Sequence, residues 1–110
     1  MQSAELFGML DFSAEKLSKI GVFATERMLC DLYCFEAGQD QAGHAHAECD
    51  KIYVVLEGGG FFRIGEEEKR LAAGQAVLAP AGIEHGVRNP GHERMICLVF
   101  VSPPPKVAAR

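Results

Sequence analysis

The feature that most constrains the fold is the short interval at which turn-forming glycine and proline residues recur. They mark junctions at Gly38 to Gly43, Gly58 to Gly60, Gly65, Ala73-Gly74, Pro80 to Gly82 and Asn89 to Gly91. The segments between them are rich in apolar, β-prone residues and are too short for stable helices. This pattern predicts an all-β chain of about eight to ten short strands, arranged as an antiparallel sandwich or barrel.

We expect strands at 22–25, 28–35, 52–56, 61–64, 76–79, 86–88 and 95–101, with a shorter one around Leu71. One short helical turn is expected near the start, because Ser13 can cap a turn through Leu17 before Gly21 stops it. Pro103 to Pro105 should end the last strand, since proline cannot donate to a sheet.

Length and charge narrow the functional classes. The 110 residues, almost half of them apolar, fit a single domain over 1–110. A net charge of −4 offers no basic field, so neither nucleic acid nor membrane is an expected partner. With no secretory signal or membrane-length apolar run recognisable, the prediction is a cytoplasmic protein with reduced cysteines, among which Cys49 is expected to be a surface thiol.

Three histidines form the candidate site. His44 and His46 are two residues apart, so an extended strand presents both imidazoles on one face. His85 follows the rigid turn at Pro80 to Gly82 and should begin a strand that crosses the same sheet. Three neutral imidazoles suit iron, nickel, zinc or manganese and leave coordination positions open. An HxH pair alone also occurs on ordinary solvated strands.

The surrounding spacing is more specific. The segment Gly38-x5-His44-x-His46, followed by Lys51-x6-Gly58, resembles the first motif of the cupin superfamily. Gly74-x5-Pro80-x-Gly82-x2-His85-x3-Asn89 resembles the second motif at each of its positions, and 15 residues separate the two. The resemblance implies a double-stranded β-helix (jelly-roll) barrel, commonly a homodimer, with His44, His46 and His85 pointing inward at the family's metal position.

Lys51 departs from that pattern, because it stands where the family places a metal-binding glutamate. An ammonium group repels a nearby cation, whereas a carboxylate offsets its charge. Three outcomes are open. Burial can lower the pKa of Lys51 so that a neutral amine lies beside a metal. The lysine can stay charged in a metal-free pocket that binds an anionic or polyhydroxylated molecule. It can also turn outward and pair with Glu48 or Asp50.

Strand alternation places other residues relative to Lys51. Tyr53 and Val55 share its parity and should line the interior, while Ile52 should face the other way. Lys51 and Tyr53 are therefore the predicted ligand-binding residues. Asp50, next to Lys51, should point away from the pocket.

Two functions follow, and whether the protein is an enzyme stays open. The first is a metal-dependent cupin, for example an oxygenase or isomerase, that activates water or dioxygen or polarises a carbonyl. The second is a non-catalytic module that binds or senses a small molecule without metal.

Overall fold

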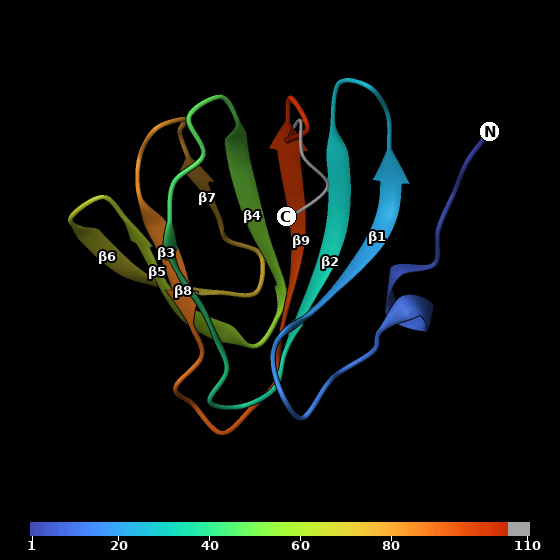
Figure 1. The fold of residues 1–110 in the computed structure, drawn as a ribbon. Coiled ribbons are helices and arrows are strands. Elements are labelled where there is room, and N and C mark those ends of the chain that lie inside the picture. Colours follow the sequence, from blue (N-terminus) through green and yellow to red (C-terminus); the bar gives the residue numbers. More distant parts are fainter. Residues whose placement is uncertain (106–110) are drawn as a thin grey trace.

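The computed structural model describes residues 1–105 as two antiparallel sheets that face each other (Figure 1). The described elements are a 3₁₀ helix η1 (Leu6–Met9) and the strands β1 (Ser18–Ala24), β2 (Leu29–Phe35), β3 (Asp40–His44), β4 (Asp50–Glu57), β5 (Gly59–Ile64), β6 (Glu67–Ala72), β7 (Ala76–Ala79), β8 (His85–Arg88) and β9 (Met95–Ser102). The prediction of an all-β jelly-roll barrel is confirmed. The predicted domain also includes 106–110, which lie outside the described residues.

Sheet order explains how distant segments share one interior. One sheet runs β1-β2-β9-β4-β7 and the other β3-β8-β5-β6. The C-terminal strand β9 lies between β2 and β4 and pairs with both over its length. The interior is therefore closed by residues from the beginning, middle and end of the chain, which is typical of jelly rolls.

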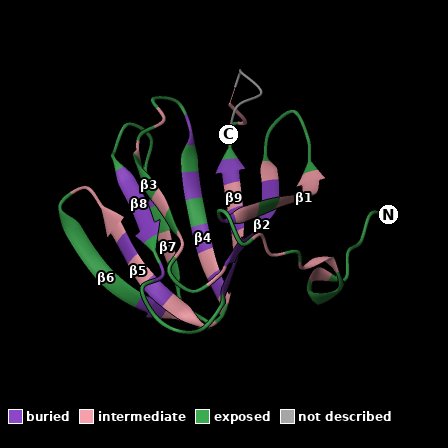
Figure 2. Ribbon diagram, turned by 60° about the horizontal axis from the view of Figure 1, so that its bottom comes forward, coloured by how far each residue is buried: buried purple, intermediate pink, exposed green. Residues whose placement is uncertain are grey.

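Strand β4 shows the alternation expected from its sequence. Lys51, Tyr53 and Val55 are buried, whereas Ile52 is exposed, and the alternating colours along β4 in Figure 2 show this change. Tyr53 and Val55 belong to the main core, together with Phe35, Phe62 and other buried residues of both sheets. Full burial of a large apolar side chain contributes roughly 1.5–3 kcal/mol, so this core holds the two sheets together.

The N-terminal region differs from the prediction. The helical turn lies at Leu6–Met9, and the Ser13–Leu17 segment is not helical. Ser13 does accept a hydrogen bond, from the backbone N–H of Glu15 at 3.2 Å, but the turn is not continued. Gly21 lies inside β1 at an irregularity of its pairing with β2. A short isolated helix is marginal, and the chain pairs with β2 from Ser18 onward, directly after this segment.

The Gly58 turn between β4 and β5 requires glycine. Its φ is +74°, and a Cβ added there would collide with the carbonyl oxygen of Arg94. The positive φ and the close carbonyl oxygen both disfavour a residue with a side chain at this position. The close approach brings the β4–β5 connection against the start of β9.

The four cysteines are free and buried. Cys49 was predicted to be a surface thiol, and this is wrong, because its side chain is 7% exposed and packs in the core. The residue directly precedes β4, where the chain turns inward toward Lys51. None of the helical segments in residues 1–105 has the length and apolar character needed to cross a lipid bilayer.

Candidate functional site

The three histidines meet where β3 pairs with β8. His44 ends β3 and lies directly opposite His85, the first residue of β8. An irregularity between Gln41 and His44 shifts the register of this pair. His46 was expected on the same extended strand as His44, and this is wrong, because β3 ends at His44 and His46 lies in the following loop. There the carbonyl of His46 accepts a hydrogen bond from the N–H of Gly82 at 2.8 Å. The turn at Pro80 to Gly82, identified in the sequence, therefore fixes the backbone at His46.

The imidazole rings lie close together. Ring centroids are 4.2 Å apart for His44 and His85, 4.9 Å for His44 and His46, and 6.3 Å for His46 and His85. The structure thus brings the predicted trio to one place. His44 and His46 line a cavity, while His85 is 2% exposed behind His44.

Backbone carbonyls fix the tautomers of two rings. Nδ1 of His44 lies 2.9 Å from the carbonyl oxygen of Ala42, and Nδ1 of His85 lies 3.1 Å from that of Ile83. A carbonyl only accepts, so each Nδ1 carries the proton and each neutral ring keeps a lone pair on Nε2. Nε2 of His85 is buried and has no hydrogen-bond partner among the described residues.

Burial also keeps the imidazoles uncharged. It lowers the pKa of His85 to about 4, with smaller lowering effects from His44, Lys51 and His46. The pKa values of His44 and His46 are lowered as well, mainly by burial and then by the neighbouring cations. At neutral pH the cluster is therefore a set of acceptors rather than a set of positive charges.

Lys51 points into this interior instead of outward. It is 3% exposed, and its Nζ lies 4.9 Å from the ring centroid of Tyr33 and 5.0 Å from that of Tyr53. Burial, together with the charge of Lys19, lowers the pKa of Lys51 to about 7, although Asp31 opposes the shift. The possibility of an outward lysine paired with Asp50 does not hold: Asp50 is exposed and accepts a hydrogen bond from the N–H of Ala81 at 2.9 Å.

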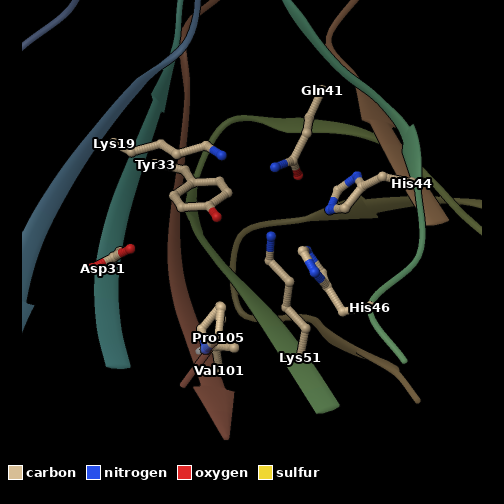
Figure 3. Close-up of a pocket in the computed structure, with 9 residues that line it drawn as sticks. All are labelled: Lys19, Asp31, Tyr33, Gln41, His44, His46, Lys51, Val101 and Pro105. Atoms are coloured by element: carbon tan, nitrogen blue, oxygen red, sulfur yellow. The ribbon is translucent and has the colours of Figure 1, made fainter. Parts of the chain in front are cut away.

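A cavity of about 230 Å³ lies between the sheets at this point. Its lining consists of Lys19, Asp31, Tyr33, Gln41, His44, His46, Lys51, Val101 and Pro105. In Figure 3 the nitrogen ends of Lys19, Lys51, His44 and His46 point toward the same space. In the part of the chain that the structure describes, the cavity therefore combines two amines with neutral imidazoles and one carboxylate.

Sequence reasoning assigned three of the described lining residues to the site and missed the other six: Lys19, Asp31, Tyr33, Gln41, Val101 and Pro105. Lys19 reaches the cavity because β1 pairs with β2, which sets Lys19 opposite Tyr33 with its Nζ 5.1 Å from that ring's centroid. Gln41 precedes the irregularity in β3. Tyr33 could have been found from the alternation of β2, but nothing local indicates which strand lies beside it.

Tyr53 lies on the interior side, as predicted, but its hydroxyl already has a partner. It is fully buried and donates a hydrogen bond to Oε1 of Gln41 at 2.5 Å. Burial raises its pKa far above the ordinary range, so the hydroxyl stays protonated. Tyr53 thus orients Gln41, which does line the cavity.

The site fits a resident metal only in part. The bare Nε2 atoms of His44 and His85 are suitable donors, and a carbonyl partner at Nδ1 is common behind metal-bound imidazole. Against this, residues 1–105 contain no group of three or more His, Cys, Asp or Glu side chains arranged to hold a metal ion. An amine also occupies the position of the expected carboxylate. The metal therefore stays a prediction.

Comparison with known proteins supports the fold and its family. Residues 31–101 match the family model described as a cupin domain. The TT1209 protein of Thermus thermophilus is 46% identical with a TM-score of 0.93, covering 96% of this chain and 100% of that one. An RmlC-like cupin of Desulfovibrio desulfuricans is 31% identical with a TM-score of 0.84, covering 96% and 99%.

One curated relative has a name that states what that relative binds. Auxin-binding protein 1 of Arabidopsis thaliana is 31% identical over 83 residues. The match covers 67% of this chain but spans only 41% of the length of that relative.

Proposed function

Because the chain belongs to the cupin domain family, we propose that the cavity between its sheets binds a small molecule that carries a carboxylate. The observation that supports this most strongly is the position of Lys51. Its amine lies inside the barrel at the cavity wall, with Lys19 across the same space. A buried lysine is costly unless its charge has a use, and an incoming anion supplies one.

The charge balance favours a monoanion. Among the described residues, two lysines and the carboxylate of Asp31 line the cavity, and the imidazoles are neutral. Over residues 1–105 the lining therefore carries one positive charge in excess when Lys51 is protonated. A bound carboxylate would neutralise this charge and raise the pKa of Lys51, since an opposite charge nearby favours the ammonium form.

The neutral groups suit the remainder of such a ligand. His44 offers a bare Nε2 as an acceptor for a hydroxyl, and the side-chain amide of Gln41 can donate or accept. Tyr33 provides an aromatic wall, and Val101 and Pro105 add apolar surface. The cavity is smaller than sites for drug-sized ligands, which enclose roughly 300–1,000 Å³, so a ligand of few heavy atoms fits best.

The comparisons are consistent with a binding role. The name of the curated relative says that it binds auxin, and its matched region is 31% identical to this chain. The ligand proposed for this chain is inferred from the charges and the size of its own cavity and not from this relative.

Calorimetric titration of the purified chain tests the proposal. Acetate, L-lactate and pyruvate are compared with the uncharged acetamide, and Lys51→Met is compared with Lys69→Met. Lys69 lies on the exposed strand β6, away from the cavity. We expect at least one carboxylate to bind saturably, acetamide not to bind, and Lys51→Met to weaken binding about tenfold or more, the equivalent of about 1.4 kcal/mol. Equal binding by both variants, or by acetamide, would overturn the proposal.

A further inference from the structure

We propose that Lys51 is also a nucleophile, which forms an imine with the carbonyl carbon of a small 2-oxo acid held in the cavity. The inference rests on the proposed function in one respect: the carboxylate of the 2-oxo acid is the anion that the cavity binds. It goes further by giving the protein a covalent chemistry.

The position of Lys51 is that of a reactive amine rather than a surface charge. The side chain comes from β4, which lies between β9 and β7 in the five-stranded sheet, and is 3% exposed. Nζ lies about equally far from the rings of Tyr33 and Tyr53, at 4.9 and 5.0 Å from their centroids. Figure 3 shows that it ends at the cavity, beside His46. A bound molecule can therefore reach the nitrogen, while bulk water is largely kept away.

The same surroundings favour the uncharged amine that nucleophilic attack requires, provided that Lys19 and not Lys51 holds the carboxylate of the 2-oxo acid. Desolvation penalises the ammonium form, and Lys19 adds a second positive charge on the same cavity. Burial beside another cation is a known way to activate an amine for imine formation.

Two amines can divide the work on a 2-oxo acid. Lys19 comes from β1 of the same sheet and lines the same cavity, with its Nζ 5.1 Å from the ring centroid of Tyr33, so its ammonium group can hold the carboxylate. The adjacent carbonyl carbon can then face Lys51. The Nε2 atom of His44 carries a lone pair, and its ring lines the same cavity, so it can take a proton and return it.

The step is balanced without any further reactant. The Nζ lone pair forms a bond to the carbonyl carbon, and the carbonyl π electrons move to oxygen. One proton passes from nitrogen to that oxygen through the imidazole, which gives a carbinolamine. The second N–H proton and the hydroxyl group then leave as water, which forms the C=N bond. The sum is one amine and one carbonyl giving one imine and one water, with no change of oxidation state.

Reductive trapping tests the proposal on the full chain. Pyruvate and cyanoborohydride are added at pH 7, and peptide mass spectrometry locates any reduced pyruvyl group among the lysines. We expect Lys51 to be labelled about tenfold faster than the exposed Lys16 and Lys69. Lys51→Arg, which keeps a cation but offers no amine, should lose this fast phase only. Labelling spread evenly over the surface lysines, or a fast phase that survives in Lys51→Arg, would overturn the proposal.

A second readout and a non-carbonyl ligand separate this proposal from the binding function. An imine acidifies the neighbouring carbon, so the chain should speed exchange of the pyruvate methyl protons in D₂O, and Lys51→Arg should not. L-Lactate has the carboxylate but no carbonyl. If lactate binds and pyruvate is not trapped at Lys51, the imine is refuted while the binding function stands. If acetone is trapped at Lys51 as fast as pyruvate, the imine stands and carboxylate recognition fails.

Discussion

His44 and His85 lie directly opposite each other across the β3–β8 pairing, with ring centroids 4.2 Å apart and each Nδ1 held by a carbonyl two residues earlier in the chain. The backbone thus sets both ring orientations. Nε2 of His44 is left as an acceptor at the cavity, and Nε2 of His85 is buried behind it without a hydrogen-bond partner among the described residues. The predictions depend on these neutral imidazoles and on the buried amine of Lys51 beside them.

Lys51→Met should raise stability most at low pH. The native pKa of about 7 lies below the value of about 10.4 for an exposed lysine. Between these values the unfolded chain binds more protons, so the free energy of unfolding of the native protein rises with pH. The methionine variant lacks this dependence. We expect its melting temperature to exceed the native one by at least about 4 °C at pH 6, and the gain to shrink toward pH 10.

Thermal unfolding of the native chain, Lys51→Met and Lys69→Met across this pH range measures the difference. Lys69→Met controls for removing one surface charge. Lys19, Asp31, His44 and His46 face Lys51 and are present in all three proteins. Removing Lys51 also removes a positive charge that lowers the pKa values of His44, His46 and His85, so the decisive comparison is the change between pH 7 and pH 10, above the range in which the histidines titrate. A gain that does not change with pH would show that Lys51 is not titrating with a lowered pKa.

A carboxylate at position 51 should favour a metal. If the buried amine is what opposes a divalent ion among the three imidazoles, Lys51→Glu should bind iron, nickel, zinc or manganese at least about tenfold more tightly than the native chain, because the charge at this position is reversed. Elemental analysis and metal titration of both proteins provide the measurement. Adding His44→Ala to the variant should abolish the gain. Near-stoichiometric metal in the native chain would instead support the predicted three-histidine metal site.

Tyr53→Phe should affect stability more than charge recognition. The substitution removes the hydrogen bond from the hydroxyl to Gln41 and leaves that amide without its buried partner. We expect a loss of about 0.5–1.5 kcal/mol in the free energy of unfolding. Carboxylate binding should weaken less than in Lys51→Met. Denaturant unfolding and calorimetry check both, and an equal loss of binding in the two variants would argue for a direct ligand contact by Tyr53.

Gly58→Ala should be more damaging than Gly74→Ala. Both glycines have positive φ, so alanine at either position costs about 1–2 kcal/mol of backbone strain. Only at Gly58 would the new Cβ also collide with a backbone oxygen, that of Arg94, whereas nothing lies within 4 Å of a Cβ at Gly74. Denaturant unfolding should therefore place Gly58→Ala clearly below Gly74→Ala. Similar losses would mean that the turn at Gly58 relaxes easily.

Much of this structure could be predicted from the local sequence. Turn residues and the alternation of β4 predicted most of the strands, the inward side of Tyr53 and the outward side of Asp50. The segment Gly38 to Gly43 was predicted as a junction, which is wrong, because it contains most of β3. Of the three outcomes left open for Lys51, the structure excludes the outward one. Motif spacing predicted that His44, His46 and His85 come together. Lys19 could not be predicted, because it enters the cavity through the register of β1 on β2, and that register depends on tertiary pairing. Cys49 was misjudged because the polar residues on either side of it do not reveal that its own side chain turns inward.

The homodimer and the cytoplasmic location expected from the sequence both stay predictions. Ile52 and Leu78 are exposed neighbours in the β4–β7 pairing, so an apolar strip is present on the outer face of that sheet.

The most direct test of the account is the pKa of Lys51 itself, followed by NMR on ¹⁵N-lysine-labelled protein and assigned with Lys51→Arg. We predict that the pKa of Lys51 is about 7 in the free chain and that it rises when a carboxylate such as L-lactate saturates the cavity. A pKa near that of an exposed lysine, about 10.4, with no response to added carboxylate, would contradict it.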